Sequence, residues 1–353
     1  YWDLSFRQKS SRSESGIIDE LDELLRDTVK MHLLSDVRVG SFLSGGLDSS
    51  TVASIMASVS SEPVPVFSIG VKDQSFNELP FARLVAEKYG MEAHERIVDA
   101  DLIRLIPKMI YHMDEPSDPF GVGVYLVSEV ASEVVKVVLG GDGGDENFAG
   151  YDRFAGQRFV DYYSVVPHWL RKSFIQKIVD RLPESFGYKS FAQKAAWLNE
   201  MSFYSGGERY AQSMSFLRFT ERAKRQLFTE KSLKAIDDDD CFAKILSHFN
   251  AENADHLIDK MLFTDLMTRM PDHLLTLVDR MTMAHSLESR SPLIDYKVVE
   301  YAASLPADMK LRGKNLKYAL KRVAERYLPK ELIYRQKQGF SFPIGRWMRT
   351  ELK

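Results

Sequence analysis

The chain has 353 residues, 44% hydrophobic and 27% charged, with a formal net charge of −3, as is typical of a globular protein long enough for two ordinary domains. The charge gives no electrostatic case for nucleic acid or an anionic membrane, and no apolar run reaches the roughly 18 residues that a membrane helix needs. A single cysteine, Cys241, excludes an intrachain disulfide framework and predicts a reducing, cytoplasmic location.

Hydrophobic patterning predicts alternating helices and strands over the first 150 residues. After an irregular leader over 1–15, apolar residues from Ile17 to Val29 recur at helical spacing and predict a first amphipathic helix. Four strands and four helices are then predicted, with glycine ending the second of these helices. The strands cover 37–43, 64–71, 92–99 and 134–141, and the helices cover 48–59, 77–90, 100–113 and 125–134.

This alternation predicts an α/β fold in which a parallel sheet carries helices on both faces. Ligands of such sheets bind beyond the carboxyl ends of the strands. After about Tyr151 the strand signals disappear, so we expect the rest of the chain to be mostly helical. We predict an α/β core over 16–154 and a helical portion over 155–353, which packs on the core and completes the active site.

The stretch SFLSGGLDSS, residues 41–50, places two glycines between a buried strand and a helix. Such a turn is an anion site, because free backbone N–H groups point at the ligand. It is no Walker loop, since Asp48 stands where a lysine would be. A carboxylate repels phosphate unless Mg²⁺ bridges them, so the turn predicts a magnesium-held pyrophosphate with Ser44 and Ser49 donating hydrogen bonds. An ordinary turn with Asp48 as a helix cap is the alternative.

A second glycine-rich stretch, LGGDGGDENFAGYDRF at 139–154, follows the last predicted strand. It gathers Asp142, Asp145 and Glu146 among five glycines. Clustered carboxylates repel one another unless a metal, a cationic substrate or a shared proton relieves them. Because both stretches follow strands, we expect them to meet at one edge of the sheet. A solvated acidic loop is the alternative.

Together, SGGLDSS and GGDGGDENFAGYDRF resemble the synthetase domain of glutamine-hydrolysing asparagine synthetases, which belong to the PP-loop (N-type) ATP pyrophosphatases with a HUP-like fold. The likeness continues in order through nearly the whole chain. It includes DEPSDP (114–119), VDRMTMAHSLESRSPLIDYKVVEYAASLP (278–306), GKNLKYALKRV (313–323) and RQKQGFSFPIGRW (335–347).

The resemblance implies a two-step reaction with ATP and Mg²⁺. A carboxylate, most simply the β-carboxylate of aspartate, is activated as an acyl-AMP with release of pyrophosphate and is then amidated. The expected partners are this carboxylate and an ammonia source, with no nucleic acid and no membrane; a homodimer is a further expectation. The N-terminal glutaminase domain is absent from this sequence, so either it is the synthetase portion of a longer or cleaved chain, or the enzyme uses ammonia or a substrate amine.

The resemblance also implies roles for individual residues. Asp142 is expected to act on the intermediate and in proton removal, and Lys337 is expected to neutralise the transferring phosphate. Asp48 and Asp118 are the expected magnesium ligands. The expected ATP-binding residues, among which Gly140 replaces a frequent serine of the family, are Leu43, Ser44, Gly45, Gly46, Asp48, Ser49, Ile69, Gly140 and Gly141.

Several residues have a second interpretation. Asp118 fits an Asp-Pro turn, and Lys337 fits a surface lysine. Three residues either reach the site or form a structural ion-pair network, and the residues alone do not decide between the two. These are Arg280, Glu288 and Arg290.

Two other functions stay open at this point. One is a related amidotransferase or ring-closing synthetase, of the β-lactam synthetase or lasso-peptide cyclase type, although no tyrosine lies between His112 and Val124, where β-lactam formers usually carry one. The other is a non-catalytic nucleotide-binding scaffold, which Asp48, Asp142 and Lys337 speak against.

Overall fold

The computed structural model describes residues 2–71, 77–98, 102–116, 120–182, 190–215, 225–236 and 241–335. The chain divides into two compact units. The sheet unit comprises residues 8–150 and 269–353, and the helical unit comprises residues 1–7 and 151–268. The chain therefore leaves the sheet unit once and returns to it. The domain boundaries expected from the sequence stay a prediction.

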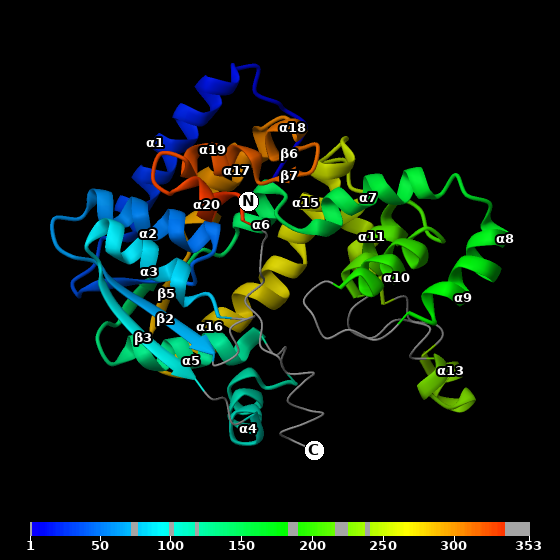
Figure 1. Cartoon of the computed structure of the whole chain (residues 1–353), viewed down its shortest axis with the longest axis horizontal. Coiled ribbons are helices and arrows are strands. Elements are labelled where there is room, and N and C mark those ends of the chain that lie inside the picture. The colour runs from blue at the N-terminus through cyan, green and yellow to red at the C-terminus, as the bar shows by residue number, and fades with distance from the viewer. Residues whose placement is uncertain are drawn as a thin grey trace. The chain divides into compact units, whose positions relative to one another are not determined.

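A five-stranded parallel sheet lies at the centre of the sheet unit (Figure 1). The strand order is β3-β2-β1-β4-β5. The α/β class is confirmed, and the first four strands fall within their predicted ranges. The strands are β1 (Val39–Phe42), β2 (Pro65–Val71), β3 (Glu92–Val98), β4 (Val137–Leu139) and β5 (Glu288–Arg290).

Helices and one short hairpin complete the sheet unit. The helix predicted to end in glycine is confirmed, since Gly90 takes a left-handed φ of 59° after Tyr89. The helical segments are α1 (Glu14–His32), α2 (Leu47–Val59), α3 (Leu79–Tyr89), α4 (Leu102–Met113), α5 (Phe120–Ser132), α6 (Gly144–Phe148), η2 (Met270–Leu275), α16 (Thr276–Met283), η3 (Pro292–Ile294), α17 (Tyr296–Ser304), α18 (Ala307–Lys310), α19 (Tyr318–Ala324) and α20 (Lys330–Ile333); β6 (Leu311–Arg312) and β7 (Asn315–Leu316) form the antiparallel hairpin.

Both faces of the sheet are covered, as predicted. Alternate residues of a strand point to opposite faces. Val66 and Val137 belong to a core cluster with apolar residues of α1, α2 and α3, whereas their neighbours Phe67 and Val138 belong to a second cluster with Val130 of α5. All five side chains are buried, so β2 and β4 have hydrophobic residues on both sides, as strands of a parallel sheet between helices require.

The fifth strand, β5, corrects the expectation that strands are confined to the first 150 residues. It pairs in parallel with β4, with Val137 opposite Glu288 and Leu139 opposite Arg290. Its three residues, Glu-Ser-Arg, are all polar and too few to show alternation, so hydrophobic patterning does not reveal them. The edge of the sheet is thus built by a segment that follows the helical unit in the sequence.

The helical unit has its own buried polar centre. Arg153 pairs with Asp265, whose other oxygen accepts a hydrogen bond of 2.6 Å from the Tyr210 hydroxyl. The Arg153 guanidinium also lies 4.1 Å from the centre of the Tyr151 ring. The segments of this unit are α7 (Asp152–Tyr163), α8 (His168–Leu170), η1 (Arg171–Ile175), α9 (Gln176–Val179), α10 (Phe191–Met201), α11 (Gly206–Ser215), α13 (Glu230–Ile236), α14 (Ala243–Phe249) and α15 (Leu257–Met267).

None of the helices in the described parts of either unit combines the length and the apolar character that crossing a membrane demands.

The strand order brings the two glycine-rich stretches together. The chain runs from β1 outward through β2 to β3, whereas β4 and β5 lie on the other side of β1. The loops after β1 and β4 therefore leave from adjacent strand ends, where such sheets bind ligands. They touch: a Cβ added to Gly141 would lie 2.5 Å from the backbone nitrogen of Ser49 and 2.9 Å from the carbonyl carbon of Asp48.

We predict that Gly141→Ala lowers the free energy of unfolding by about 1–3 kcal/mol, because the added methyl group must displace the backbone of Ser49. Urea denaturation measures this change. In the control Gly16→Ala, the nearest atom is the movable Ser13 hydroxyl, at 3.3 Å, and alanine favours the helix by up to about 1 kcal/mol. A Gly141→Ala protein as stable as the wild type would contradict the close packing of the two loops.

Candidate functional site

The turn after β1 is closed by its two serines. The Ser44 and Ser49 hydroxyl oxygens lie 2.9 Å apart, and the Gly46 backbone N–H donates to the Ser44 hydroxyl at 3.2 Å. Gly46 is the N-cap of α2, and no side chain caps this helix. Asp48 lies in the first turn of α2, so the structure does not have the alternative in which its carboxylate caps the helix.

The glycines of this turn are required by the protein itself. Gly45 has a φ of 75°, a left-handed conformation that favours glycine. A Cβ at this position would lie 2.8 Å from the Ala82 backbone nitrogen and 2.9 Å from the Phe81 Cβ. The N-terminal part of α3 therefore packs directly on the turn.

Two carboxylates from the two loops converge on one buried ammonium group. The Lys317 Nζ lies 2.5 Å from Asp48 Oδ2 and 2.7 Å from Asp145 Oδ1. The Lys317 side chain is 5% exposed, and each aspartate side chain is 18% exposed. Asp48 comes from the first turn of α2, Asp145 from the first turn of α6, and Lys317 from the residue before α19. Three segments distant in the sequence thus meet at one cation.

Electrostatics keeps this lysine charged. Burial alone would lower the pKa of Lys317, because it disfavours the charged form. Asp145 and Asp48 more than offset that effect, and the pKa of Lys317 lies above its ordinary value. The ammonium group is therefore protonated throughout the physiological range and balances one of the two negative charges beside it.

The third carboxylate of the two loops belongs to Asp142. Burial raises its pKa to about 6, and the charges of Asp48 and Asp145 act in the same direction. The Ser291 hydroxyl donates to Asp142 Oδ2 at 3.4 Å and opposes this shift. Asp142 therefore exchanges a proton near neutral pH, which is the property that a general base requires.

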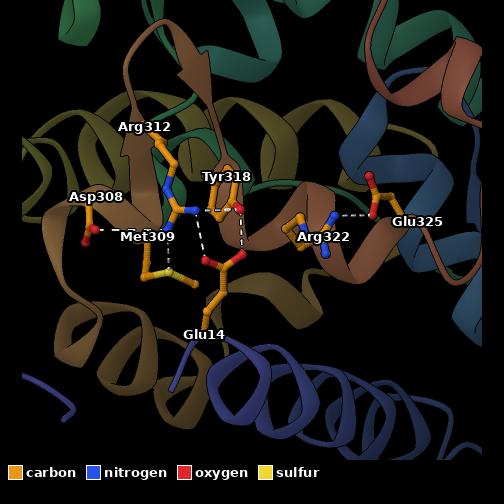
Figure 2. A network of polar contacts seen from close by, with 7 residues as sticks. All are labelled: Glu14, Asp308, Met309, Arg312, Tyr318, Arg322 and Glu325. Atoms are coloured by element: carbon orange, nitrogen blue, oxygen red, sulfur yellow. Dashed lines mark hydrogen bonds and ion pairs between the residues drawn. The ribbon is translucent and has the colours of Figure 1, made fainter. Parts of the chain in front are cut away.

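Residues that precede and follow Lys317 in the sequence form a polar network with Glu14 (Figure 2). Glu14 accepts hydrogen bonds from Arg312, at 2.8 Å, and from the Tyr318 hydroxyl, at 2.5 Å. The Arg312 guanidinium lies 3.8 Å from the centre of the Tyr318 ring. Lys317 itself has a left-handed φ of 56°, and its N–H donates to the Phe148 carbonyl at 3.1 Å. The network ties the β6–β7 hairpin and α19 to α1, and so supports the unusual backbone conformation of Lys317.

The other predicted site residues are distributed as follows. Leu43 is buried in the core below the turn. Ile69 is partly buried on β2, in register with Arg96 of β3. The Gly140 N–H donates to the Arg290 carbonyl at 2.8 Å, and a Cβ on Gly140 would lie 2.6 Å from Asp142 Oδ2. The absence of a side chain at 140 thus leaves room for the Asp142 carboxylate. Two predicted site residues lie outside the described residues: Asp118 and Lys337.

The three residues with two interpretations form ion pairs. Arg280 donates to Asp114 at 2.8 Å, in a pair whose side chains are 39% and 80% exposed. Arg290 pairs with Glu288 at 2.5 Å and donates to the carbonyl of His32 at 2.8 Å. These two ion pairs fit the structural alternative, and the interpretation of the three residues stays a prediction.

Sequence reasoning missed two members of the site. It counted Asp145 among clustered acids without giving it a role, and it passed over Lys317. Three lysines, at 314, 317 and 321, stand within eight residues of the GKNLKYALKRV stretch, and no spacing distinguishes the buried one. A positive φ at a residue other than glycine, Asn or Asp leaves no reliable mark in a sequence.

The carboxylates fit a magnesium ion. Within the described ranges, no three His, Cys, Asp or Glu side chains gather closely enough to hold a metal by themselves. Mg²⁺ commonly binds one or two carboxylates and takes its other ligands from water and substrate phosphates. Asp48 and Asp145 supply two carboxylates, and they already share one cation, the ammonium group of Lys317.

The chain is similar to known proteins along nearly its whole length. The model of the asparagine synthase family matches residues 20–353. Glutamine-hydrolyzing asparagine synthetase 1 of Bacillus subtilis (strain 168) is 30% identical over 355 residues, which cover 100% of this chain and 54% of that protein. Glutamine-hydrolyzing asparagine synthetase 3 of the same organism is 26% identical, with coverages of 99% and 53%. Amidase chyE of Penicillium rubens is 27% identical, with coverages of 98% and 56%. The chain spans about half the length of these curated relatives.

We predict that Lys317→Met lowers the free energy of unfolding by about 3–5 kcal/mol, because it removes the buried counter-charge of two carboxylates. Millimolar Mg²⁺ restores part of the loss, since it supplies a cation to the same oxygens. Chemical denaturation of both forms, with and without Mg²⁺, measures both effects.

Lys321→Met is the control, since Lys321 donates to Asn315 Oδ1 at 2.8 Å and touches neither carboxylate. It should cost much less and respond to Mg²⁺ like the wild type. Equal losses for the two variants would show that the ion pairs of Lys317 contribute nothing particular to stability.

Proposed function

Since the chain belongs to the asparagine synthase family, we propose that this ligase-type enzyme activates a substrate carboxylate, in the simplest case the β-carboxylate of aspartate, as an acyl-AMP with release of pyrophosphate and then amidates it with ammonia. The observation that carries the proposal is the convergence of Asp48 and Asp145 on one cation position. Asp142, whose pKa is raised to about 6, is coupled electrostatically to both. Pyrophosphate release that depends on ATP, Mg²⁺ and a carboxylate tests it directly.

ATP is proposed to bind at the two glycine-rich loops. The uncapped N-terminus of α2 favours negative charge. Asp48 and Asp145 would hold Mg²⁺, which when bound neutralises the phosphate oxygens. Lys317 supplies a fixed positive charge beside these two carboxylates. Asp145 thereby takes a role that the sequence does not assign, while Asp118 stays a predicted ligand.

Amide formation requires a group that accepts a proton from the attacking nitrogen. Asp142 suits this role, since a carboxylate with a pKa of about 6 is mostly ionised at neutral pH yet basic enough to take a proton. We assign the orientation of its carboxylate to the hydroxyl of Ser291. Lys337 is proposed to neutralise the transferring phosphate. Ile69, Gly140 and Gly141 are proposed to contact the adenylate.

The wider assignments are proposals as well. The names of two relatives point to glutamine as a nitrogen source, so we propose that ammonia comes from a glutaminase domain on a longer chain. We also propose a homodimer in the cytoplasm. None of these proposals is needed for the chemistry of the synthetase site.

A second candidate function is amide formation on another carboxylate. The similarity to amidase chyE, at 27% identity over 98% of this chain, favours it, because that level is close to the identity with the asparagine synthetases. A β-lactam-forming or lasso-peptide-cyclising enzyme would be a relative of this kind. A screen of acidic substrates with ammonia, scored by pyrophosphate release and by the mass of the amide, separates these candidates from aspartate amidation.

We predict that Asp48→Asn abolishes magnesium-dependent pyrophosphate release, because the amide carries no negative charge for Mg²⁺. Asp145→Asn should have the same effect. The control Glu92→Gln should retain activity, because it loses only a 2.6 Å ion pair with Arg38 where β3 begins, away from the carboxyl ends of the strands. A coupled pyrophosphate assay over a range of Mg²⁺ concentrations measures all three. Wild-type rates in Asp48→Asn would overturn the metal assignment.

The raised pKa of Asp142 predicts a pH dependence. Protonation removes the base, so kcat/KM should fall as the pH drops through about 6. In Ser291→Ala the hydrogen bond that lowers this pKa is lost, and the acid limb should move to higher pH. Rate profiles from about pH 5 to about pH 8 show the shift. An acid limb at the same pH in both proteins would remove Asp142 from the proposed step.

The raised pKa of Asp142 should also make the folding stability depend on pH, in the opposite direction to the rate. The native state binds this proton more tightly than the unfolded chain, whose carboxyl titrates near its ordinary pKa of 3.8. The contribution of Asp142 to stability is therefore fully present below that value and is lost as the pH rises through about 6.

A further inference from the structure

Arg335 makes a buried contact with the glycine turn. Its Nη2 donates to Glu78 Oε1 at 2.5 Å and to the Gly45 carbonyl at 3.0 Å. The side chains of Arg335 and Glu78 are 14% and 10% exposed. The guanidinium also lies 4.1 Å from the centre of the Phe81 ring. One arginine thus joins the end of the described chain, the start of α3 and the turn after β1.

The contact with Gly45 determines the orientation of a peptide unit. The carbonyl of Gly45 and the N–H of Gly46 belong to one planar peptide and point in opposite directions. Arg335 holds the oxygen, and the Ser44 hydroxyl accepts from the N–H at 3.2 Å. Between two glycines a peptide can turn over at little steric cost. With both ends held, this peptide has one orientation.

We propose that Arg335 is a positioning residue for the nucleotide: clamped by Glu78 and Phe81, it fixes the Gly45–Gly46 peptide and thereby the backbone surface on which the phosphates lie. The inference rests on the proposed function, because it assumes that ATP binds this turn.

The chemistry of the clamp requires arginine. A planar guanidinium can donate to two acceptors in fixed directions and stack on an aromatic ring, whereas a lysine ammonium is a compact charge without a planar face. Glu78 is the N-cap residue of α3, and its backbone oxygen would lie 3.0 Å from a Cβ on Gly45. The backbone of the residue that holds Arg335 therefore lies against the turn.

The test is the affinity for ATP with Mg²⁺, measured by isothermal titration calorimetry on the full chain. Arg335→Lys should raise the dissociation constant about tenfold, the loss expected for one charge-assisted hydrogen bond. Glu78→Gln should raise it less, because the amide oxygen can still accept. The double variant should bind no more weakly than Arg335→Lys, since the two residues act through one contact.

Arg83→Lys is the matched control. Arg83 also lies on α3 and donates through Nε to both oxygens of Glu95, at 3.1 and 2.8 Å, but none of its contacts is with the turn. Its substitution should leave the dissociation constant unchanged. An arginine that only stabilised the fold would lower the melting temperature of Arg335→Lys and leave the affinity of the folded protein unchanged, and that result would overturn the inference.

The two proposals fail in different ways. Suppose that the wild-type protein binds ATP with Mg²⁺ but releases no pyrophosphate with any carboxylate. That result would contradict the ligase assignment. Weaker binding of ATP by Arg335→Lys would then still support the role of Arg335. If the wild-type protein releases pyrophosphate with a carboxylate while Arg335→Lys keeps full affinity for ATP, only the positioning role of Arg335 is contradicted.

Discussion

The ammonium group of Lys317 lies between the carboxylates of Asp48 and Asp145, and the arrangement of both glycine-rich loops depends on that cation. Two negative charges a few ångströms apart in a weakly polar interior repel each other by several kcal/mol. A positive charge between them reverses the sign of the interaction. The loops after β1 and β4 can therefore approach until backbone atoms touch, at Gly141 and Ser49, and the negative charge left over favours a divalent cation.

Strand order explains why these residues meet. Because β1 is central and its neighbours run in parallel, the loops that follow β1 and β4 share one edge of the sheet. Lys317 comes from a third segment, since it directly follows the β6–β7 hairpin. Its backbone N–H donates to the Phe148 carbonyl. The described part of the site is thus built by segments that are each fixed by their own neighbours.

The sequence revealed those parts of the fold that have a strong local pattern. The buried strands β1, β2 and β4 and the helix ending at Gly90 were predictable, because apolar runs and a left-handed glycine leave clear marks. The partly exposed β3 also fell within its predicted range. The three polar residues of β5 had no such pattern and found their place by pairing with β4. In the candidate site, the sequence singled out Asp48 because it replaces a lysine in the turn, and its role as a magnesium ligand stays a prediction. Lys317 was not, since its burial depends on contacts with segments far away in the sequence.

The glycines of these loops are required by the packing of the protein itself. At Gly45 the missing side chain admits α3, and at Gly141 it admits the backbone of Ser49. The sequence interpretation that bare backbone is needed for a phosphate therefore combines two requirements. A turn pressed between a helix, a second loop and the guanidinium of Arg335 has few conformations left. A backbone so confined keeps its N–H groups oriented without the ligand, and this preorganisation is what makes a glycine turn an effective binding surface.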